Sequence, residues 1–276
     1  MLVFETGEDI LPSLKGFEWT FDTEASRYEK MRPGYVNALY KEIFAYIPID
    51  ENSQVLEIGS GGGQATEPLL KTGCRLTAVE YGKNFSNLLL NKFGHYPGFD
   101  VVTSKFEEAV LERDAYDFIY SASAFHWIPE AVGYKKVYEL LKNGGVFARF
   151  ANHPYRDKYN PELSDAIDLL YNEYYCRYHK TTRKVLREYS ASDAEERALI
   201  ARKYGFTDIK YSLFTRERIF SGKEYTELLR TYSDHIAIEE PIRKEFFKKI
   251  EMAIDDHGGT ITIFDTIDLQ LARKVL

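Results

Sequence analysis

The stretch Gln54-Val-Leu-Glu-Ile-Gly-Ser-Gly-Gly-Gly-Gln-Ala-Thr66 decides the fold of this chain. Its first part is apolar and β-prone apart from Glu57, which predicts a buried strand. Four glycines then fall within residues 59–63, where they permit positive φ angles and leave no Cβ atom to obstruct a ligand. Such a turn, placed between a parallel strand and a helix, presents backbone N–H groups to a ligand. An acidic residue just before the turn favours a ligand that carries positive charge over a pyrophosphate.

Strand and helix patterns alternate through the residues that follow this turn. Helical segments of about ten residues separate the strands, and this spacing implies right-handed crossovers within a parallel sheet. The expected later strands are Arg75–Glu80, Phe99–Thr103, Tyr116–Ala122, Val146–Phe150, 208–220 and 260–269. The sequence therefore predicts an α/β fold with a Rossmann-like, seven-stranded, mostly parallel sheet, helices on both faces and an antiparallel last strand.

Two helical segments accompany this pattern. Residues 1–47 end in an amphipathic helix from Val36 to Ile47, and we expect them to form an N-terminal helical cap. Residues 152–204 lack a strong strand pattern and are rich in helix formers, which predicts a helical insertion between the fifth and sixth strands. We therefore expect residues 1–276 to form a single domain in which cap and insertion determine ligand specificity.

Composition and charge narrow the functional classes. The net charge is −7, from 36 basic and 43 acidic residues, which argues against broad binding to nucleic acids. Cys74 and Cys176 form no disulfide framework, and Cys176 has no metal-ligand spacing with His153 or His179, so no metal is predicted. The N-terminus lacks a signal-peptide pattern and no window holds about 18 apolar residues, so we expect a cytoplasmic protein that does not span a membrane.

A second landmark is Glu80, which ends the second expected strand. In a nucleotide-binding βαβ unit, an acidic residue about 20 residues after the glycines hydrogen-bonds ribose hydroxyls. The glycine turn and Glu80 have the spacing and the structural setting of such a unit. Together they predict an adenosine-type ligand with a cationic portion.

Several segments resemble class I S-adenosylmethionine-dependent methyltransferases. Glu57–Gly63 resembles the acidic-x-Gly-x-Gly-x-Gly signature of that superfamily, and Leu140–Val146 is similar to its Leu-Lys-Pro-Gly-Gly turn, with Asn143 in place of proline. Tyr116–Trp127 resembles the fourth strand of one subgroup, followed by Ala-x-x-Phe-His-Trp. Tyr28–Tyr35 is similar to an element of the trans-aconitate methyltransferase-like proteins, within the methyltransferase type 11 group. The resemblance covers about 24–150 well, the last 70 residues loosely, and leaves out the insertion.

This resemblance implies S-adenosyl-L-methionine as the cofactor. Glu57 would lie near the cofactor's amino group, Glu80 would bind the ribose hydroxyls, and Tyr81 would lie against the adenine. The other positions implied to contact the cofactor are Tyr28, Arg32, Gly59, Ser60, Gly61, Gly63, Lys105, Phe106, Glu107 and Ser121.

Methyl transfer from a sulfonium depends on alignment and exclusion of water more than on acid–base groups. If the acceptor is a hydroxyl or an amine, His126 is the candidate base; otherwise its ring packs between Phe125 and Trp127. A carboxylate acceptor needs no base and would be bound by arginine or tyrosine side chains. The candidate acceptor-binding residues are Phe125, His126, Trp127, Tyr155 and Arg156.

The leading hypothesis is a methyltransferase that acts on a small molecule. One alternative is a non-catalytic S-adenosylmethionine-binding module, which the glycine turn and Glu80 leave open. Another is a nicotinamide-dependent oxidoreductase, which Glu57 disfavours. Methylation of RNA or protein is disfavoured by the acidic balance and by Ser121-Ala-Ser-Ala124 in place of an Asn/Asp-Pro-Pro-Tyr motif. The acceptor and the oligomeric state stay open.

Overall fold

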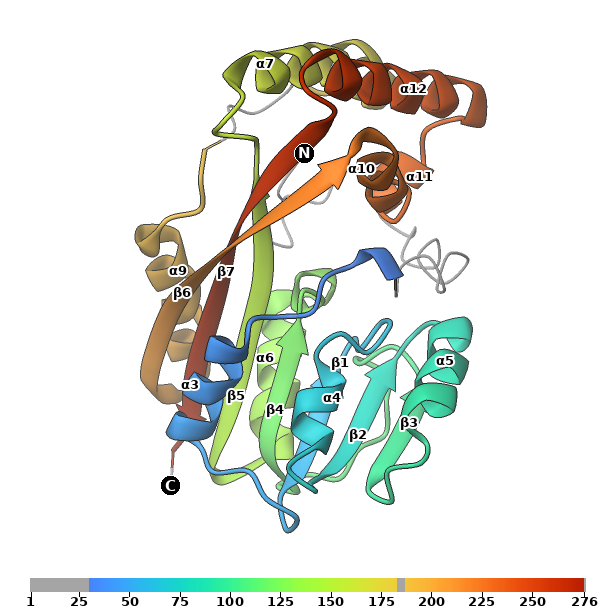
Figure 1. Cartoon of the computed structure of the whole chain (residues 1–276). Helices are drawn as coiled ribbons and strands as arrows, with labels where there is room; N and C mark the ends of the chain where they lie inside the picture. Colours follow the sequence, from blue (N-terminus) through green and yellow to red (C-terminus); the bar gives the residue numbers. More distant parts are fainter. Residues whose placement is uncertain (1–29, 183–186, 276) are drawn as a thin grey trace. The chain divides into compact units, whose positions relative to one another are not determined.

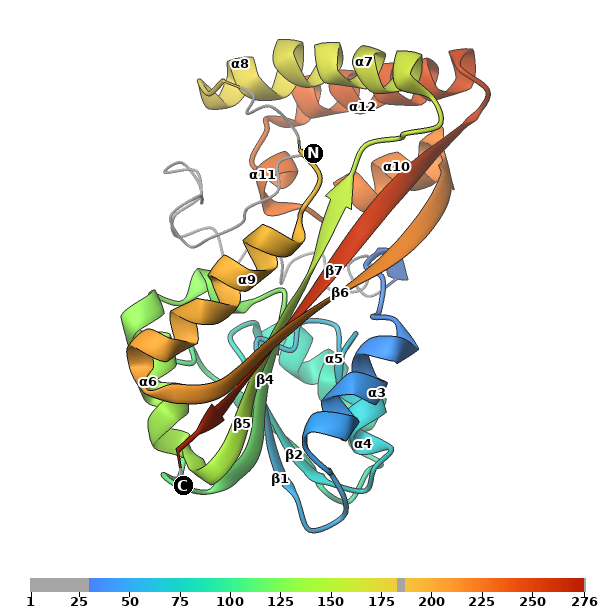
Figure 2. The ribbon, with the colours of Figure 1, turned by 90° about the vertical axis from the view of Figure 1, so that its left-hand side faces the viewer.

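A computed structural model describes residues 30–182 and 187–275 of the protein. A seven-stranded sheet has the strand order β3-β2-β1-β4-β5-β7-β6 (Figure 1). The first five strands pair in parallel, and β7 runs antiparallel to its neighbours (Figure 2). The strands are β1 Gln54–Ile58, β2 Arg75–Glu80, β3 Phe99–Thr103, β4 Tyr116–Ala122, β5 Leu141–Tyr155, β6 Phe206–Ser221 and β7 Thr260–Lys274. The predicted sheet and its antiparallel last strand are confirmed.

The chain divides into two compact units. Within the described residues, the sheet unit comprises residues 33–152, 189–214 and 267–275, and the helical unit comprises residues 30–32, 153–182, 187–188 and 215–266. Residues 1–29 of the expected N-terminal cap lie outside the described residues. That residues 1–276 form one domain with a cap and an insertion stays a prediction.

Helices cover both faces of the sheet within the sheet unit (Figure 2). Strand residues alternate between the two faces, so Val55 and Phe118 pack with one set of helices while Leu56 and Ile119 pack with the other. The first set is α3 Asn37–Tyr46, α4 Thr66–Leu70 and α5 Lys83–Phe93. The second set includes α6 Glu130–Leu140, with the 3₁₀ turn Ile200–Tyr204 that follows α9 Ala191–Leu199. Both faces are therefore buried, as expected for a parallel sheet.

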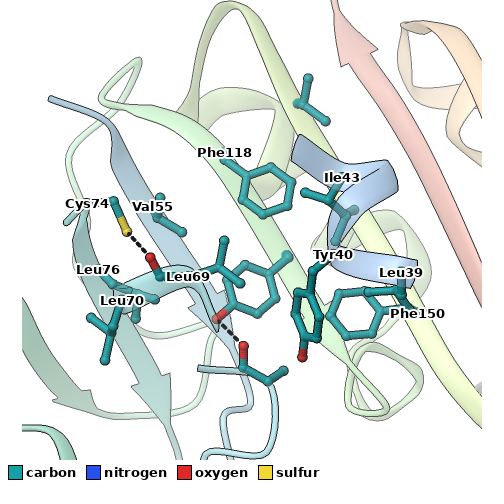
Figure 3. Close-up of a cluster of buried hydrophobic side chains, with 14 of the residues drawn as sticks. Leu39, Tyr40, Ile43, Val55, Leu69, Leu70, Cys74, Leu76, Phe118 and Phe150 are labelled. Atoms are coloured by element: carbon teal, nitrogen blue, oxygen red, sulfur yellow. Dashed lines mark hydrogen bonds between the residues drawn. The ribbon is translucent and has the colours of Figure 1, made fainter. Parts of the chain in front are cut away.

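Figure 3 shows the core on the α3 side of the sheet. Leu39 and Ile43 of α3 are fully buried and belong to one cluster with Leu69 of α4 and Val55 of β1. Tyr40 places a polar hydroxyl in this apolar cluster, and that hydroxyl has no hydrogen-bond partner within the described residues. This side of the core therefore contains a buried polar group without a hydrogen-bond partner among the described residues.

The helical unit has a core of its own. Tyr171 and Tyr175 pack with Phe246, Phe247 and Ile250, and all five side chains are almost completely buried. Its helices are α7 Pro161–Leu170, the π-helical turn Tyr171–Cys176, α8 Arg177–His179, α10 Gly222–Leu229, α11 Ser233–Ile236 and α12 Glu240–Asp256.

Several predicted strand boundaries are wrong. Strand β6 begins at Phe206 instead of residue 208, and β7 continues to Lys274 instead of ending at residue 269. Strand β5 is longer than the expected Val146–Phe150, because α6 ends at Leu140 and the residues Asn143-Gly-Gly145 lie inside the strand instead of ending the helix. The register shifts from Tyr116↔Leu141 to Phe118↔Val146, so a bulge in β5 absorbs the glycines.

Helix α4 begins only at Thr66, since residues 61–65 belong to the turn. Pro68 is tolerated in the first turn of α4, where its missing N–H has no intrahelical acceptor. In residues 30–182 and 187–275 no helix is long and apolar enough to cross a membrane. The same residues contain no group of three or more His, Cys, Asp or Glu side chains arranged to hold a metal ion.

We predict that Phe246→Ala lowers the free energy of unfolding by about 3–5 kcal/mol, because it leaves a cavity in the core of the helical unit. Phe246 is 0% exposed, whereas Met252 on the same helix is 47% exposed. Met252→Ala is therefore the matched control and should change stability by less than about 0.5 kcal/mol. Chemical denaturation measures both variants. Equal effects of the two would contradict the assigned core.

Candidate functional site

The candidate site lies where the strand order of the sheet reverses. Strand β1 pairs with β2 on one side and with β4 on the other, and all three run in parallel. The turn at residues 59–63 follows β1 directly. In open α/β sheets, ligands bind beyond the carboxyl ends of the strands at such a switch point.

The turn requires glycine at particular positions. Gly59, Gly61 and Gly63 have φ angles of +70°, +52° and +77°, a region that other residues rarely adopt. A Cβ atom on Gly59 would lie 2.5 Å from the Cβ of Ala124. A Cβ atom on Gly63 would lie 2.4 Å from the ring of Phe93. The turn therefore contacts both helix α5 and the segment that follows β4.

Glu80 links the turn to the end of β2. One carboxylate oxygen accepts a hydrogen bond from the N–H of Gly61, and the other accepts one from the N–H of Gly82, each at 2.8 Å. The side chain is 8% exposed. A carboxylate offers about four lone-pair positions, and Glu80 uses two of them to hold the backbone at Gly61 and Gly82.

Glu57 is completely buried below the turn. Its Oε2 accepts a hydrogen bond from the Thr66 hydroxyl at 2.6 Å, whereas its Oε1 has no partner within the described residues. The Ser60 hydroxyl and the side-chain nitrogen of Gln64 are likewise buried without a partner there. Burial raises the pKa of Glu57 to about 7, although the hydrogen bond from Thr66 opposes the shift. The site thus offers a buried acceptor oxygen to a cationic donor such as an amino group.

The residues expected around the adenine follow β2 and β3. Tyr81 is 46% exposed, and the Lys105 ammonium lies 5.2 Å from the centre of its ring. Phe106 is buried in the core on the α6 side of the sheet, so its ring serves packing. Lys136 donates a hydrogen bond to the Glu107 carbonyl at 3.2 Å. The structure therefore brings Tyr81 and Lys105 together. Because the ring of Phe106 packs in the core, the expected contact of residues 105–107 with the adenine would come from their backbone.

The segment after β4 is anchored to the neighbouring strands. The Ser121 hydroxyl donates to the Ile58 carbonyl at 2.9 Å. The Ser123 hydroxyl lies 2.8 Å from that of Tyr35, and Ser123 has a φ angle of +55°. Backbone strain of this kind is often retained at functional sites. Sequence patterns gave no indication of the pair formed by Ser123 and Tyr35, since neither the strain nor the contact is encoded locally.

The 3₁₀ turn Phe125–Trp127 completes this segment. Phe125 is 4% exposed and its ring centre lies 5.0 Å from that of Phe147, so the ring belongs to the core. His126 and Trp127 are half-buried, with their ring centres 5.2 Å apart.

The remaining candidate residues either belong to the helical unit or lie outside the residues that the structure describes. Tyr28 lies outside the described residues. Arg32 donates two hydrogen bonds to Thr231, at 3.0 and 3.1 Å, and stacks over the ring of Tyr232. Arg156 pairs with Asp168 of α7 at 2.9 Å, and Tyr155 ends β5 half-buried. Roles of these residues in binding stay predictions.

Comparison with known proteins agrees with this geometry. Residues 56–149, which run from β1 into β5, match the family described as "Methyltransferase domain". The chain is a class I S-adenosylmethionine-dependent methyltransferase. An uncharacterized methyltransferase of Schizosaccharomyces pombe is 26% identical over 224 residues, which cover 80% of this chain and 82% of that protein. S-adenosylmethionine is accordingly the methyl donor of this enzyme.

Two solved structures share the fold of the methyltransferase. A protein assigned as a type II methyltransferase from Anaeromyxobacter dehalogenans has a TM-score of 0.63 at 20% identity. The match covers 88% of this chain and 98% of the Anaeromyxobacter protein. Phosphoethanolamine N-methyltransferase 2 of Haemonchus contortus, solved with phosphomonomethylethanolamine and S-adenosylhomocysteine, has a TM-score of 0.55 at 16% identity and covers 100% of this chain. This chain spans 61% of the length of that second structure.

We predict that the stability of the ligand-free methyltransferase decreases as the pH rises between about 5 and 8 because of Glu57. Its folded pKa of about 7 exceeds the ordinary value of 4.5, so the folded chain binds this proton more tightly than the unfolded chain does. The resulting stability is present at low pH and is lost as the pH rises through the folded pKa, by about 2–3 kcal/mol. When Glu57→Gln is denatured at several pH values in this range, its free energy of unfolding should lack this decrease with rising pH. Glu67→Gln, at an exposed position of α4, should retain it.

We also predict that Gly59→Ala weakens the binding of S-adenosylhomocysteine at least tenfold, because the new Cβ atom would displace the segment after β4. Titration calorimetry measures the change. The double variant Gly59→Ala with Ala124→Gly removes the clashing atom and should recover part of the affinity, leaving the strain of the positive φ. A folded Gly59→Ala protein with unchanged affinity would contradict this account of the turn.

Proposed function

We propose that the enzyme transfers the methyl group to a small-molecule acceptor, at a hydroxyl or carboxylate oxygen. The observation that carries the proposal is the contact between the turn and the segment after β4, where Gly59 approaches Ala124. The donor turn and the hydroxyls of Ser121 and Ser123 thus belong to one local structure. The net charge of −7 disfavours a polyanionic acceptor such as RNA.

The proposed contacts with the cofactor come from residues in and next to the turn at residues 59–63. Glu57 would accept a hydrogen bond from the cofactor's amino group at Oε1, which has no other donor within the described residues. Glu80 would accept hydrogen bonds from the ribose hydroxyls while it holds the Gly61 N–H. Tyr81, with Lys105 beside it, would lie along the adenine. When bound, the cofactor supplies an electrophilic methyl group on a sulfonium.

The protein's own contribution is position and exclusion of water. The bond from Ser121 to Ile58 fixes the end of β4 against β1, and the bond between Ser123 and Tyr35 fixes the next turn of chain. For a hydroxyl acceptor, His126 would remove the proton, since its ring is half-buried and not part of the core cluster. For a carboxylate acceptor the nucleophile is already ionised and no base is needed.

The test is release of S-adenosylhomocysteine with a panel of small hydroxy compounds and carboxylic acids. We predict that His126→Ala lowers kcat for a hydroxyl acceptor by about 100-fold or more and leaves methylation of a carboxylate within a few-fold. His95→Ala, at an exposed position, is the matched control and should leave both activities unchanged. Turnover with RNA or protein but with no member of the panel would refute the small-molecule acceptor. Equal loss on both acceptor types would assign His126 to packing.

A further inference from the structure

A second cluster of charged side chains lies within the sheet unit, on the α6 side of the sheet. It consists of Arg149 on β5, Arg197 on α9 and Asp268 on β7. Arg149 and Arg197 are 8% and 9% exposed, and Asp268 is 0% exposed. Two guanidinium groups therefore share one buried carboxylate.

The carboxylate of Asp268 is engaged mainly by other donors. It accepts hydrogen bonds from the Ala151 N–H at 2.8 Å, from the Tyr189 hydroxyl at 3.2 Å and from the Gln270 amide. The nearest contact from Arg197 is 3.8 Å, from Nη1 to Oδ2, which is too long for a hydrogen bond.

The arginines keep donors without acceptors. Arg149 donates from Nη1 to the Tyr134 hydroxyl at 2.7 Å, and its guanidinium lies 4.8 Å from the centre of the Phe125 ring. Its Nε, together with Nε and Nη1 of Arg197, is buried and has no partner within the described residues. Burial of an unpaired charge and of unmet donors is costly.

The titratable groups that the described residues place around the cluster do not balance its charge. Tyr189 stays neutral because burial, with the charge of Asp268 beside it, raises its pKa. Burial lowers the pKa of Arg149, and the neighbouring Arg197 acts in the same direction. The groups that face one another are Arg149 on β5, Tyr134 on α6, Arg197 on α9, Asp268 on β7 and Tyr189, which precedes α9. Their sum is one positive charge.

We propose that Arg149 and Arg197 form a binding site for the carboxylate group of a small organic acid. One negative charge matches the surplus, whereas a phosphate dianion would exceed it. The two oxygens of a carboxylate accept several N–H groups in the planar geometry that guanidinium groups present. Arg149 pairs in register with Ser121, and its guanidinium lies over Phe125, so the site adjoins the segment after β4.

Binding of ¹³C-labelled acetate to the full-length protein tests this site, with nuclear magnetic resonance line widths as the readout. We expect saturable binding to the wild type and at least tenfold weaker binding to Arg149→Met and to Arg197→Met. Arg202→Met, which removes a positive charge at an exposed position close to α9, should bind as the wild type does. Absence of saturable binding to the wild type, or equal loss in Arg202→Met, would overturn the proposal.

Thermal unfolding measurements distinguish a variant that has lost the binding site from a variant that has lost its fold. In acetate-free buffer of low ionic strength, Arg149→Met should unfold at or above the wild-type temperature, because burial and the neighbouring Arg197 disfavour the charge that it removes. Acetate should then raise the unfolding temperature of the wild type but not that of the variant. A variant that is destabilised equally with and without acetate would show that Arg149 is only a structural partner of Tyr134, and the proposal would fail.

Competition separates the two sources of the carboxylate. Displacement of labelled acetate by butyrate and benzoate, but not by butyramide and benzamide, would support a site for the carboxylate of a larger molecule. Displacement by formate alone would support a site for a free small acid. Displacement by the amides as readily as by the acids would overturn the assignment to a carboxylate.

Discussion

The site depends on one interaction, the pair of hydrogen bonds that Glu80 accepts from the N–H groups of Gly61 and Gly82. Without it, a turn with three residues at positive φ would have little to hold it, since glycine loses more conformational entropy on ordering than any other residue. Charge-assisted hydrogen bonds to backbone N–H groups are among the stronger ones in proteins. The residue that resemblance assigns to the ribose therefore also organises the turn, and these two hydrogen bonds hold its carboxylate in a buried position.

Much of the sheet was predictable because its signals are local. Strands β2, β3 and β4 begin and end where the apolar runs meet turn residues, at Arg75–Glu80, Phe99–Thr103 and Tyr116–Ala122. Strand β5 was not, because its length depends on a bulge opposite Tyr116 that only the pairing with β4 creates. The glycine turn was predictable for the same local reason. The pair of Ser123 with Tyr35 and the cluster of Arg149 with Arg197 join residues far apart in sequence, and no short pattern encodes such contacts.

The sheet unit thus has buried polar atoms without hydrogen-bond partners, among the described residues, on both of its faces. Those on one face include an oxygen of an acidic side chain, and those on the other belong to basic side chains. On the α3 side, Glu57 keeps an oxygen without a donor within the described residues, near the unpartnered hydroxyl of Tyr40. On the α6 side, Arg149 and Arg197 keep N–H groups without acceptors. Polar groups left in this state cost about 1–3 kcal/mol each. A cation on the first face and an anion on the second would remove that cost, so ligand binding and stability are coupled in this unit.

In the helical unit, by contrast, the buried carboxylates of Asp234 and Asp265 have hydrogen-bond partners. Burial alone would raise the pKa of Asp234, but His235 and Tyr175 hold it at about 2, with contacts of 2.8 Å to each. Tyr171 in turn lies 2.9 Å from the second ring nitrogen of His235. Asp265 likewise accepts hydrogen bonds from Arg216 and Arg218. A network satisfied in this way orders the core without a ligand. Among the described residues of the helical unit, one buried charged atom lacks a hydrogen-bond partner, Nε of Arg230, and it lies 3.0 Å from a carboxylate oxygen of Glu227. The sheet unit, where Glu57, Arg149 and Arg197 keep such atoms, is therefore the unit in which ligand binding would add most to stability.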